Sequence, residues 1–269
     1  MDKRDIFTLL VVAYMLSAPV SAARILFYEV DAGEYSMLTG YKAFADELKK
    51  KHEIASIEKG GVTKDKLDKY DILIIPNSKR QMSSEEISSI IWFVLQEGKA
   101  LFITNAEPSS NQLTIPFGTT IDSGLLIDST DTIPGMDRYN FIVSEFPDHQ
   151  ASNTIRRGVT KIGFYKGNGM DVSGNSKCIA RTSADTYSDT GSFPAGSRPC
   201  VASASMFGSG LVVILNNGKL LNKDNINNYN NKQFGMNIIE WLSLARESIG
   251  EENNTQVLHL TIKGMRLEN

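Results

Sequence analysis

Two apolar runs joined by a capped helix constrain the fold of this chain more than any other feature. Ile72–Ile75 and Ala100–Thr104 are short and continuously apolar, as expected of parallel strands that are covered on both faces. Between them, Ser83 and Glu86 have the spacing of a capping box, and apolar residues recur at helical spacing over Ile87–Leu95. The segment therefore predicts a strand, a helix and a second strand of one parallel sheet.

The residues on either side extend this alternation of strands and helices. Arg24–Val30 and Ile54–Ile57 have the apolar character of strands, and Thr39–Lys51 places apolar residues at the spacing of an amphipathic helix. A last helix is predicted from about Lys232 to Ala245, with one apolar face. The alternation predicts an α/β fold with a doubly wound, mostly parallel sheet.

The composition changes after Pro108, where Gly, Ser, Thr and Asp become frequent and short strand-like runs replace long helices. Gly208 and Gly210 favour a turn between the last two runs, so a hairpin is expected there. We expect additional antiparallel strands in this second half, at Gly124–Ile127, Thr160–Phe164, Lys177–Ala180, Cys200–Ala204 and Leu211–Leu215.

Length and charge exclude some function classes. The 269 residues suffice for one large α/β domain or two small ones. The formal net charge is -3, and Lys and Arg are scattered along the chain. Nucleic-acid binding would require a basic stripe, so no nucleic-acid partner is expected.

The N-terminus has the three-part pattern of a secretory signal peptide. Lys3 and Arg4 precede the apolar stretch Ile6–Leu16, and Val20–Ala22 offers a small-residue cleavage motif. Residues 1–22 are therefore predicted to be a signal peptide, and the protein to be secreted or extracytoplasmic and associated with the cell surface. A buried helix or an uncleaved membrane anchor remains an alternative for this segment.

The predicted export affects the expected oxidation state of the two cysteines, Cys178 and Cys200. Both lie in predicted strands. In an oxidising compartment such a pair favours a disulfide. Two buried thiols that act as small hydrophobic side chains are the alternative.

Four stretches in this order resemble the class I glutamine-amidotransferase-like superfamily: Arg24–Lys51, Tyr70–Asn105, Phe146–Gly167 and Gly210–Leu242. Relatives of that fold include the N-terminal domain of an intraflagellar transport subunit and components of gliding-motility transporters. The resemblance implies a flavodoxin-like sheet over residues 24–245, followed by a tail, 246–269, that could add one strand. For many members it implies binding or scaffolding without known catalysis.

The resemblance also argues against one chemistry. In true amidotransferases a nucleophilic cysteine follows the strand that corresponds to Ala100–Thr104. Here the turn is Asn105–Pro108, which contains no cysteine and no Gly-x-Cys-x-Gly motif. Glutamine amidotransferase activity is therefore not expected, and the sequence indicates no cofactor.

The carboxyl ends of the parallel strands are the expected place for a ligand, because open α/β sheets bind ligands there. The strands deliver six polar candidates to that edge, namely Glu29, Asp31, Glu34, Asn77, Asn105 and Glu107. The carboxylates among them, Glu29, Asp31, Glu34 and Glu107, could hold Ca²⁺ or Mg²⁺, but no ligand loop of fixed spacing supports this, so no metal site is predicted. We predict that a protein or a glycan, which the sequence does not identify further, binds at this edge. His149 is a seventh candidate residue for contact with this partner.

A hydrolase is the alternative function. It would use His149 as the base, with Ser109, Ser110 or a carboxylate as its partner. Neither serine lies in a Gly-x-Ser-x-Gly elbow, and a loop-positioning role for His149 competes with the catalytic one.

Overall fold

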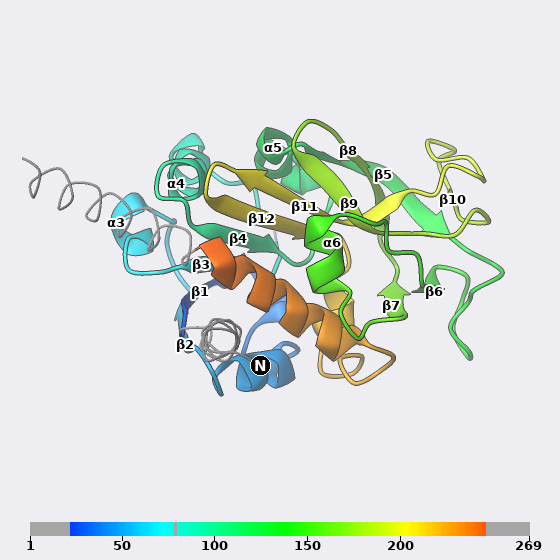
Figure 1. The fold of residues 1–269 in the computed structure, drawn as a ribbon, viewed down its shortest axis with the longest axis horizontal. Coiled ribbons are helices and arrows are strands. Elements are labelled where there is room, and N and C mark those ends of the chain that lie inside the picture. The colour runs from blue at the N-terminus through cyan, green and yellow to red at the C-terminus, as the bar shows by residue number, and fades with distance from the viewer. Residues whose placement is uncertain (1–21, 78–79, 246–269) are drawn as a thin grey trace, which may run out of the picture.

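A ten-stranded mixed sheet runs through the molecule (Figure 1). The computed structural model describes residues 22–77 and 80–245. The predicted signal peptide and the predicted C-terminal tail lie outside these residues, apart from Ala22. Among the described residues, no helix has both the length and the apolar character needed to cross a membrane.

One half of the sheet is parallel. Its strands are β1 (Arg24–Tyr28), β2 (Glu53–Ile57), β3 (Ile72–Ile75), β4 (Ala100–Ile103) and β12 (Gly210–Leu215). They lie in the order β2-β1-β3-β4-β12, which is the strand order of a flavodoxin-like sheet with β12 in the fifth place. The predicted flavodoxin-like fold is thereby confirmed.

The other half is antiparallel and continues from β12. The β12 strand forms the predicted hairpin with β11 (Cys200–Phe207), and β11 also pairs with β9 (Ser176–Arg181) and β8 (Asn168–Val172). β5 (Thr119–Ile127) and β10 (Tyr187–Ser188) complete that edge, while β6 (Asn140–Val143) and β7 (Ile162–Tyr165) form a separate two-stranded sheet.

Helices cover both faces of the parallel half, because its strand residues alternate between two cores. Phe27 and Phe102 belong to the core under α2 (Lys42–Leu48) and the last helix, 231–245, drawn in orange across the sheet in Figure 1. Leu26 and Leu101 belong to the opposite core, under α3 (Lys64–Leu67), α4 (Ser84–Leu95) and α5 (Asn111–Thr114). The molecule is therefore a three-layer α/β structure over this half.

Some elements differ from the expectation. The helix predicted at Thr39–Lys51 begins only at Lys42, since the preceding residues form turns and a 3₁₀ segment at Gly33–Tyr35. β6, β8 and β10 were not predicted. β8 contains Asn168, Gly169 and Asp171, residue types that are depleted in strands, and its pairing with β5 and β11 holds it extended.

Candidate functional site

The carboxyl ends of β1, β3, β4 and β12 bring polar residues to one edge of the sheet, as parallel strands must. We call this edge the strand-end rim and define it by the six predicted residues Glu29, Asp31, Glu34, Asn77, Asn105 and Glu107. It also includes Gly218, which follows β12 and which sequence reasoning missed.

The floor of the rim is a buried hydroxyl network. The Tyr41 hydroxyl lies 2.7 Å from Thr104 Oγ1 and 2.9 Å from the carbonyl oxygen of Gly218. Thr104 Oγ1 in turn lies 3.1 Å from the carbonyl oxygen of Pro76. Burial raises the pKa of Tyr41 well above its ordinary value, so this phenol stays protonated. The network ties the ends of β3, β4 and β12 together.

Asn105 begins the turn that follows β4. Its Oδ1 accepts a hydrogen bond from the Gly218 N–H at 3.1 Å, and its Nδ2 donates to Glu107 Oε1 at 3.2 Å. Gly218 has to be glycine here, because a Cβ at that position would lie 2.5 Å from the Tyr41 hydroxyl. The Asn105 amide therefore fixes two strand-end turns against each other.

Glu29 shapes the loop after β1. Its side chain is buried and accepts a hydrogen bond from the Met37 N–H. Burial raises the pKa of Glu29 above its ordinary value, although the Met37 N–H opposes the shift. Beside it, Asn77 Nδ2 donates to the carbonyl oxygen of Asp31 at 3.4 Å. These contacts hold the loop over the end of β1.

The outer part of the rim is acidic. Asp31 and Glu34 are exposed, and Glu107 is half-buried. Burial raises the pKa of Tyr35 above its ordinary value, and the charges of Glu34 and Glu107 raise it further. The rim thus presents hydrogen-bond acceptors and negative charge to solvent.

The two candidate serines have different surroundings. Ser110 is buried in the 3₁₀ segment Pro108–Ser110, and its Oγ accepts a hydrogen bond from the Glu107 N–H at 2.9 Å. Ser109 is exposed on the same segment. Ser110 therefore has the role of a turn-stabilising side chain in this structure.

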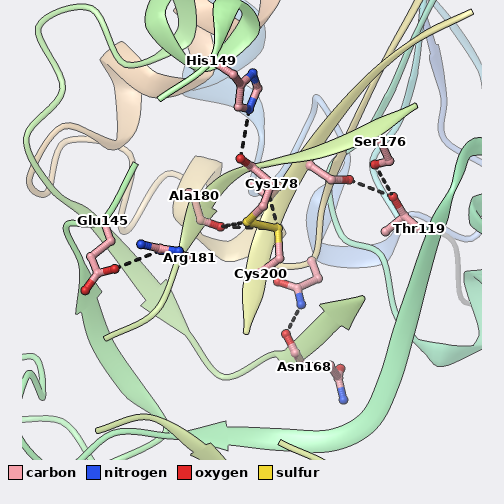
Figure 2. Close-up of a disulfide and its surroundings, with 12 residues drawn as sticks. Thr119, Glu145, His149, Asn168, Ser176, Cys178, Ala180, Arg181 and Cys200 are labelled. Carbon is pink, nitrogen blue, oxygen red and sulfur yellow. Dashed lines mark hydrogen bonds and ion pairs between the residues drawn. A yellow bond between two sulfur atoms is a disulfide. The ribbon is translucent and has the colours of Figure 1, made fainter. Parts of the chain in front are cut away.

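His149 lies on the antiparallel half and is bound to backbone through both ring nitrogens. It is the N-cap of α6 (Gln150–Ile155), where Nδ1 accepts from the Ser152 N–H at 3.4 Å. Its Nε2 lies 3.0 Å from the carbonyl oxygen of Cys178 and therefore acts as the donor (Figure 2). Within the described part of the chain, no hydrogen bond joins His149 to a rim carboxylate or to either candidate serine.

The predicted disulfide is present. Cys178 on β9 and Cys200 on β11 are bonded, with their Cα atoms 5.7 Å apart and a sequence separation of 22 residues (Figure 2). It links two neighbouring antiparallel strands. In residues 22–77 and 80–245, no three His, Cys, Asp or Glu side chains gather in a way that could hold a metal ion.

A second group at the strand ends was only partly expected. Arg80 pairs with Glu86, the capping-box residue of α4, and both contact the Tyr28 hydroxyl at the end of β1. Burial and the Glu86 hydrogen bond raise the pKa of Tyr28 to about 12. The group borders a cleft of about 490 Å³ that also contains Gly60 and Gly61. The capping pattern in the sequence identified Glu86 only as a helix cap and did not indicate its contacts with Arg80 and Tyr28.

The fold is similar to several solved structures. The mmIFT52 N-terminal domain matches at 14% identity with a TM-score of 0.68, over 81% of this chain and 97% of that one. A ThuA-like protein from Bacteroides uniformis ATCC 8492 matches at 10% identity with a TM-score of 0.56, over 84% of this chain and 92% of that one. A β-galactosidase from Rahnella sp. R3 matches at 12% identity with a TM-score of 0.50, over 85% of this chain but only 31% of the enzyme.

At these identities the likeness shows the fold alone. The chain shares its α/β fold with the mmIFT52 N-terminal domain and with the ThuA-like protein, which is consistent with the resemblance found in the sequence. No protein-family model matches the sequence, and no curated protein matches it either.

Proposed function

We propose that this protein is an exported, non-catalytic binding domain that engages a partner at the strand-end rim. The observation that carries the proposal is the hydrogen bonding of Asn105, whose amide holds Gly218 and Glu107 in the turn where the resemblance would place a nucleophilic cysteine. A turn built this way supports a fixed surface and offers no activated nucleophile. The disulfide and the N-terminal signal pattern support export.

The rim favours a protein partner with a basic and partly apolar surface. The exposed carboxylates of Asp31 and Glu34 would meet basic side chains. Leu38, on the same loop, is 76% exposed and would supply an apolar contact. The alternative partner is a glycan, whose hydroxyl groups would bind the same carboxylates. The experiment must distinguish this glycan from a protein partner.

The binding test changes one charged and one apolar residue beside the rim and compares them with a charge reversal at the opposite end of the parallel strands. Tagged wild-type protein, Glu34→Lys and Leu38→Ser are incubated with the extracellular fraction of the source cells and, separately, with an immobilised glycan array. Glu53→Lys is the matched control, because Glu53 is an exposed glutamate at the opposite end of the strands, where β2 begins.

We expect a partner protein that is retained by wild type and by Glu53→Lys but lost by Glu34→Lys and by Leu38→Ser. Binding on the glycan array alone would replace the protein partner by a glycan. Equal retention by all four proteins would contradict a role for the rim.

The absence of catalysis is tested separately. A fluorophosphonate reagent labels serines that a neighbouring base activates, so we expect Ser109 and Ser110 to stay unlabelled in native protein. Labelling of either serine that disappears in a His149→Ala variant would overturn the non-catalytic proposal in favour of a hydrolase.

A further inference from the structure

A second cleft, of about 470 Å³, lies on the antiparallel half of the sheet beside the disulfide. We call it the disulfide cleft. Its walls come from β8, β9, the segment before β11 and the start of α6, and they include Met170, Asp171, Lys177, Cys178, Arg181, Phe193, Arg198 and Cys200. Its volume is within the range of small-molecule sites, about 300–1,000 Å³.

Two arginines that line this cleft, Arg181 and Arg198, share the carboxylate of Glu145, which lies beside it. Glu145 Oε2 accepts a hydrogen bond from Arg181 Nε at 3.0 Å, and the same carboxylate accepts from Arg198 Nη1 at 2.6 Å (Figure 2 shows the Glu145–Arg181 pair). The trio therefore has a net positive charge. Each guanidinium has five N–H donors, and within the described residues Glu145 is the only side chain that accepts from either of them.

The backbone fixes both arginines in place. Arg181 lies opposite Cys200 in the β9–β11 pairing, next to the disulfide, and its N–H donates to the carbonyl oxygen of Glu145 at 3.0 Å. Arg198 has a φ of +52°, in the left-handed region that non-glycine residues rarely adopt. Such strain persists only where the surrounding structure holds it. The backbone at both arginines is therefore held, and the shared Glu145 carboxylate positions their guanidinium groups.

The remaining walls are apolar or already neutralised. Phe193 and Met170 are buried hydrophobic residues at the cleft. Asp148 is paired with Arg156, so that carboxylate does not cancel the positive charge of the arginines. Lys177 and Asp171 balance each other in formal charge. What remains is one excess positive charge beside an apolar wall.

We propose that the disulfide cleft binds a small organic carboxylate, with Arg181 and Arg198 holding the carboxylate group and Phe193 and Met170 contacting the apolar part of the ligand. A planar guanidinium can bind a planar carboxylate through two parallel hydrogen bonds. In the structure Arg198 Nη1 contacts both oxygens of Glu145 and Arg181 contacts one of them through Nε, so the remaining N–H groups of both arginines are those that would hold the ligand. The site is distinct from the strand-end rim, and neither proposal depends on the other.

The test measures binding of three probes by isothermal titration calorimetry and by the shift in Tm of the disulfide-intact protein. N-acetylphenylalanine represents a carboxylate from an amino acid, and glucuronate represents one from a sugar. Inorganic sulfate is a tetrahedral anion without a planar carboxylate or an apolar part. We expect saturable binding of at least one organic carboxylate, tighter than that of sulfate. Saturation by sulfate with equal or greater affinity would refute selectivity for a planar carboxylate.

Variants then assign the binding to the two arginines. Arg181→Lys and Arg198→Lys keep the positive charge but lose the planar set of N–H donors of the guanidinium group. Each should weaken binding of the organic carboxylate by about tenfold or more. Arg198→Gly should weaken it at least as much, and glycine accepts the positive φ at that position, so this variant retains the fold even if the lysine variant does not.

The matched control is Arg156→Lys, which changes an arginine whose partner is Asp148 and which does not line the cleft. It should bind the probes as wild type does. Unchanged affinity in both Arg198 variants, or failure of every probe to bind, would overturn the proposal.

Discussion

The Tyr41 hydroxyl makes the most specific stabilising contact at the strand ends. It contacts Thr104 Oγ1 and the carbonyl oxygen of Gly218 in a fully buried setting. Tyr41→Phe would leave that carbonyl without its partner, and we expect a loss of about 1–3 kcal/mol in the free energy of unfolding. Urea denaturation measures the loss.

The control for this prediction is Tyr70→Phe, which removes a hydroxyl from a half-buried tyrosine that only borders the core. It should change the free energy of unfolding by less than Tyr41→Phe does. An equal effect of the two substitutions would mean that the Tyr41 network contributes nothing specific.

Asp71 makes the stability of the protein depend on pH. Burial alone would raise its pKa, but hydrogen bonds from Arg24 and Lys99 outweigh burial and hold the pKa below the ordinary value. A carboxyl whose pKa is lowered on folding stabilises the protein above its unfolded pKa, and the stabilisation is lost as the pH falls through the folded pKa.

Asp71→Asn should therefore lower the free energy of unfolding by about 1–3 kcal/mol at pH 7. The difference in the free energy of unfolding between wild type and Asp71→Asn should shrink below about pH 4, because the Asp71 carboxyl of the unfolded chain is protonated there. Urea denaturation at pH 7 and pH 3 measures both values. Asp224→Asn, a change at an exposed carboxylate, is the control and should have little effect at either pH. A difference that stays constant with pH would contradict the assignment.

At the residue scale, the sequence located several rim residues but could not assign their contacts. Strand order alone brings Asn105 and Glu107 to the carboxyl edge. The burial of Glu29 depends on a loop that turns back over β1, with Asp31 at a φ of +60° and Met37 donating to the carboxylate. Neither the turn nor the donor has a sequence pattern, because any non-proline backbone N–H can fill that role.

At the element scale, α4 owes its start to a capping box. Ser83 Oγ accepts from the Glu86 N–H, and the Glu86 carboxylate accepts from the Ser83 N–H. Ser83→Ala should cost about 1 kcal/mol in the free energy of unfolding, as loss of an N-cap does. Ser88→Ala, an exposed change within the same helix, is the control and should be neutral or slightly stabilising, since alanine is the better helix former. A Ser83→Ala protein as stable as wild type would contradict the cap.

The disulfide stabilises the pairing of β9 with β11. It closes a loop with a sequence separation of 22 residues, for which the chain-entropy model gives about 3 kcal/mol. The paired substitution of Cys178→Ser with Cys200→Ser should lower the free energy of unfolding by about this amount. Urea denaturation in the absence of reductant measures it, and alkylation with mass spectrometry should find no free thiol in wild type. Two free thiols in the native protein would contradict the bridge.

The elements that could be predicted are those whose pattern is local. The α4 helix combines a cap with an apolar stripe, and β3 and β4 are continuous apolar runs, so each could be identified from its own residues. β6 and β8 could not, because neither is a continuous apolar run: β6 begins with Asn140, and Asn168 and Gly169 disfavour a strand in β8. Their extended state depends on partners that are distant in sequence.

At the scale of the whole molecule, the two halves of the sheet share one core. β12 pairs with β4 on one side and β11 on the other, and one cluster of buried side chains contains both Phe27 of β1 and Ile179 of β9. Unfolding should therefore be a single cooperative transition. Fluorescence of Trp92 and Trp241, and far-UV circular dichroism, should give the same midpoint in urea. Two separated midpoints would show that the halves unfold independently.

The position of β12 also sets the order in which the sheet can be completed during synthesis. β4 ends at Ile103, but its outer neighbour, β12, begins only at Gly210. Until the ribosome has passed that point, the backbone groups along one side of β4 have no strand to pair with, and an open strand edge invites pairing with other chains. We therefore expect the nascent chain to depend on chaperones until β12 has been synthesised. A chain truncated before β12 would be prone to aggregation.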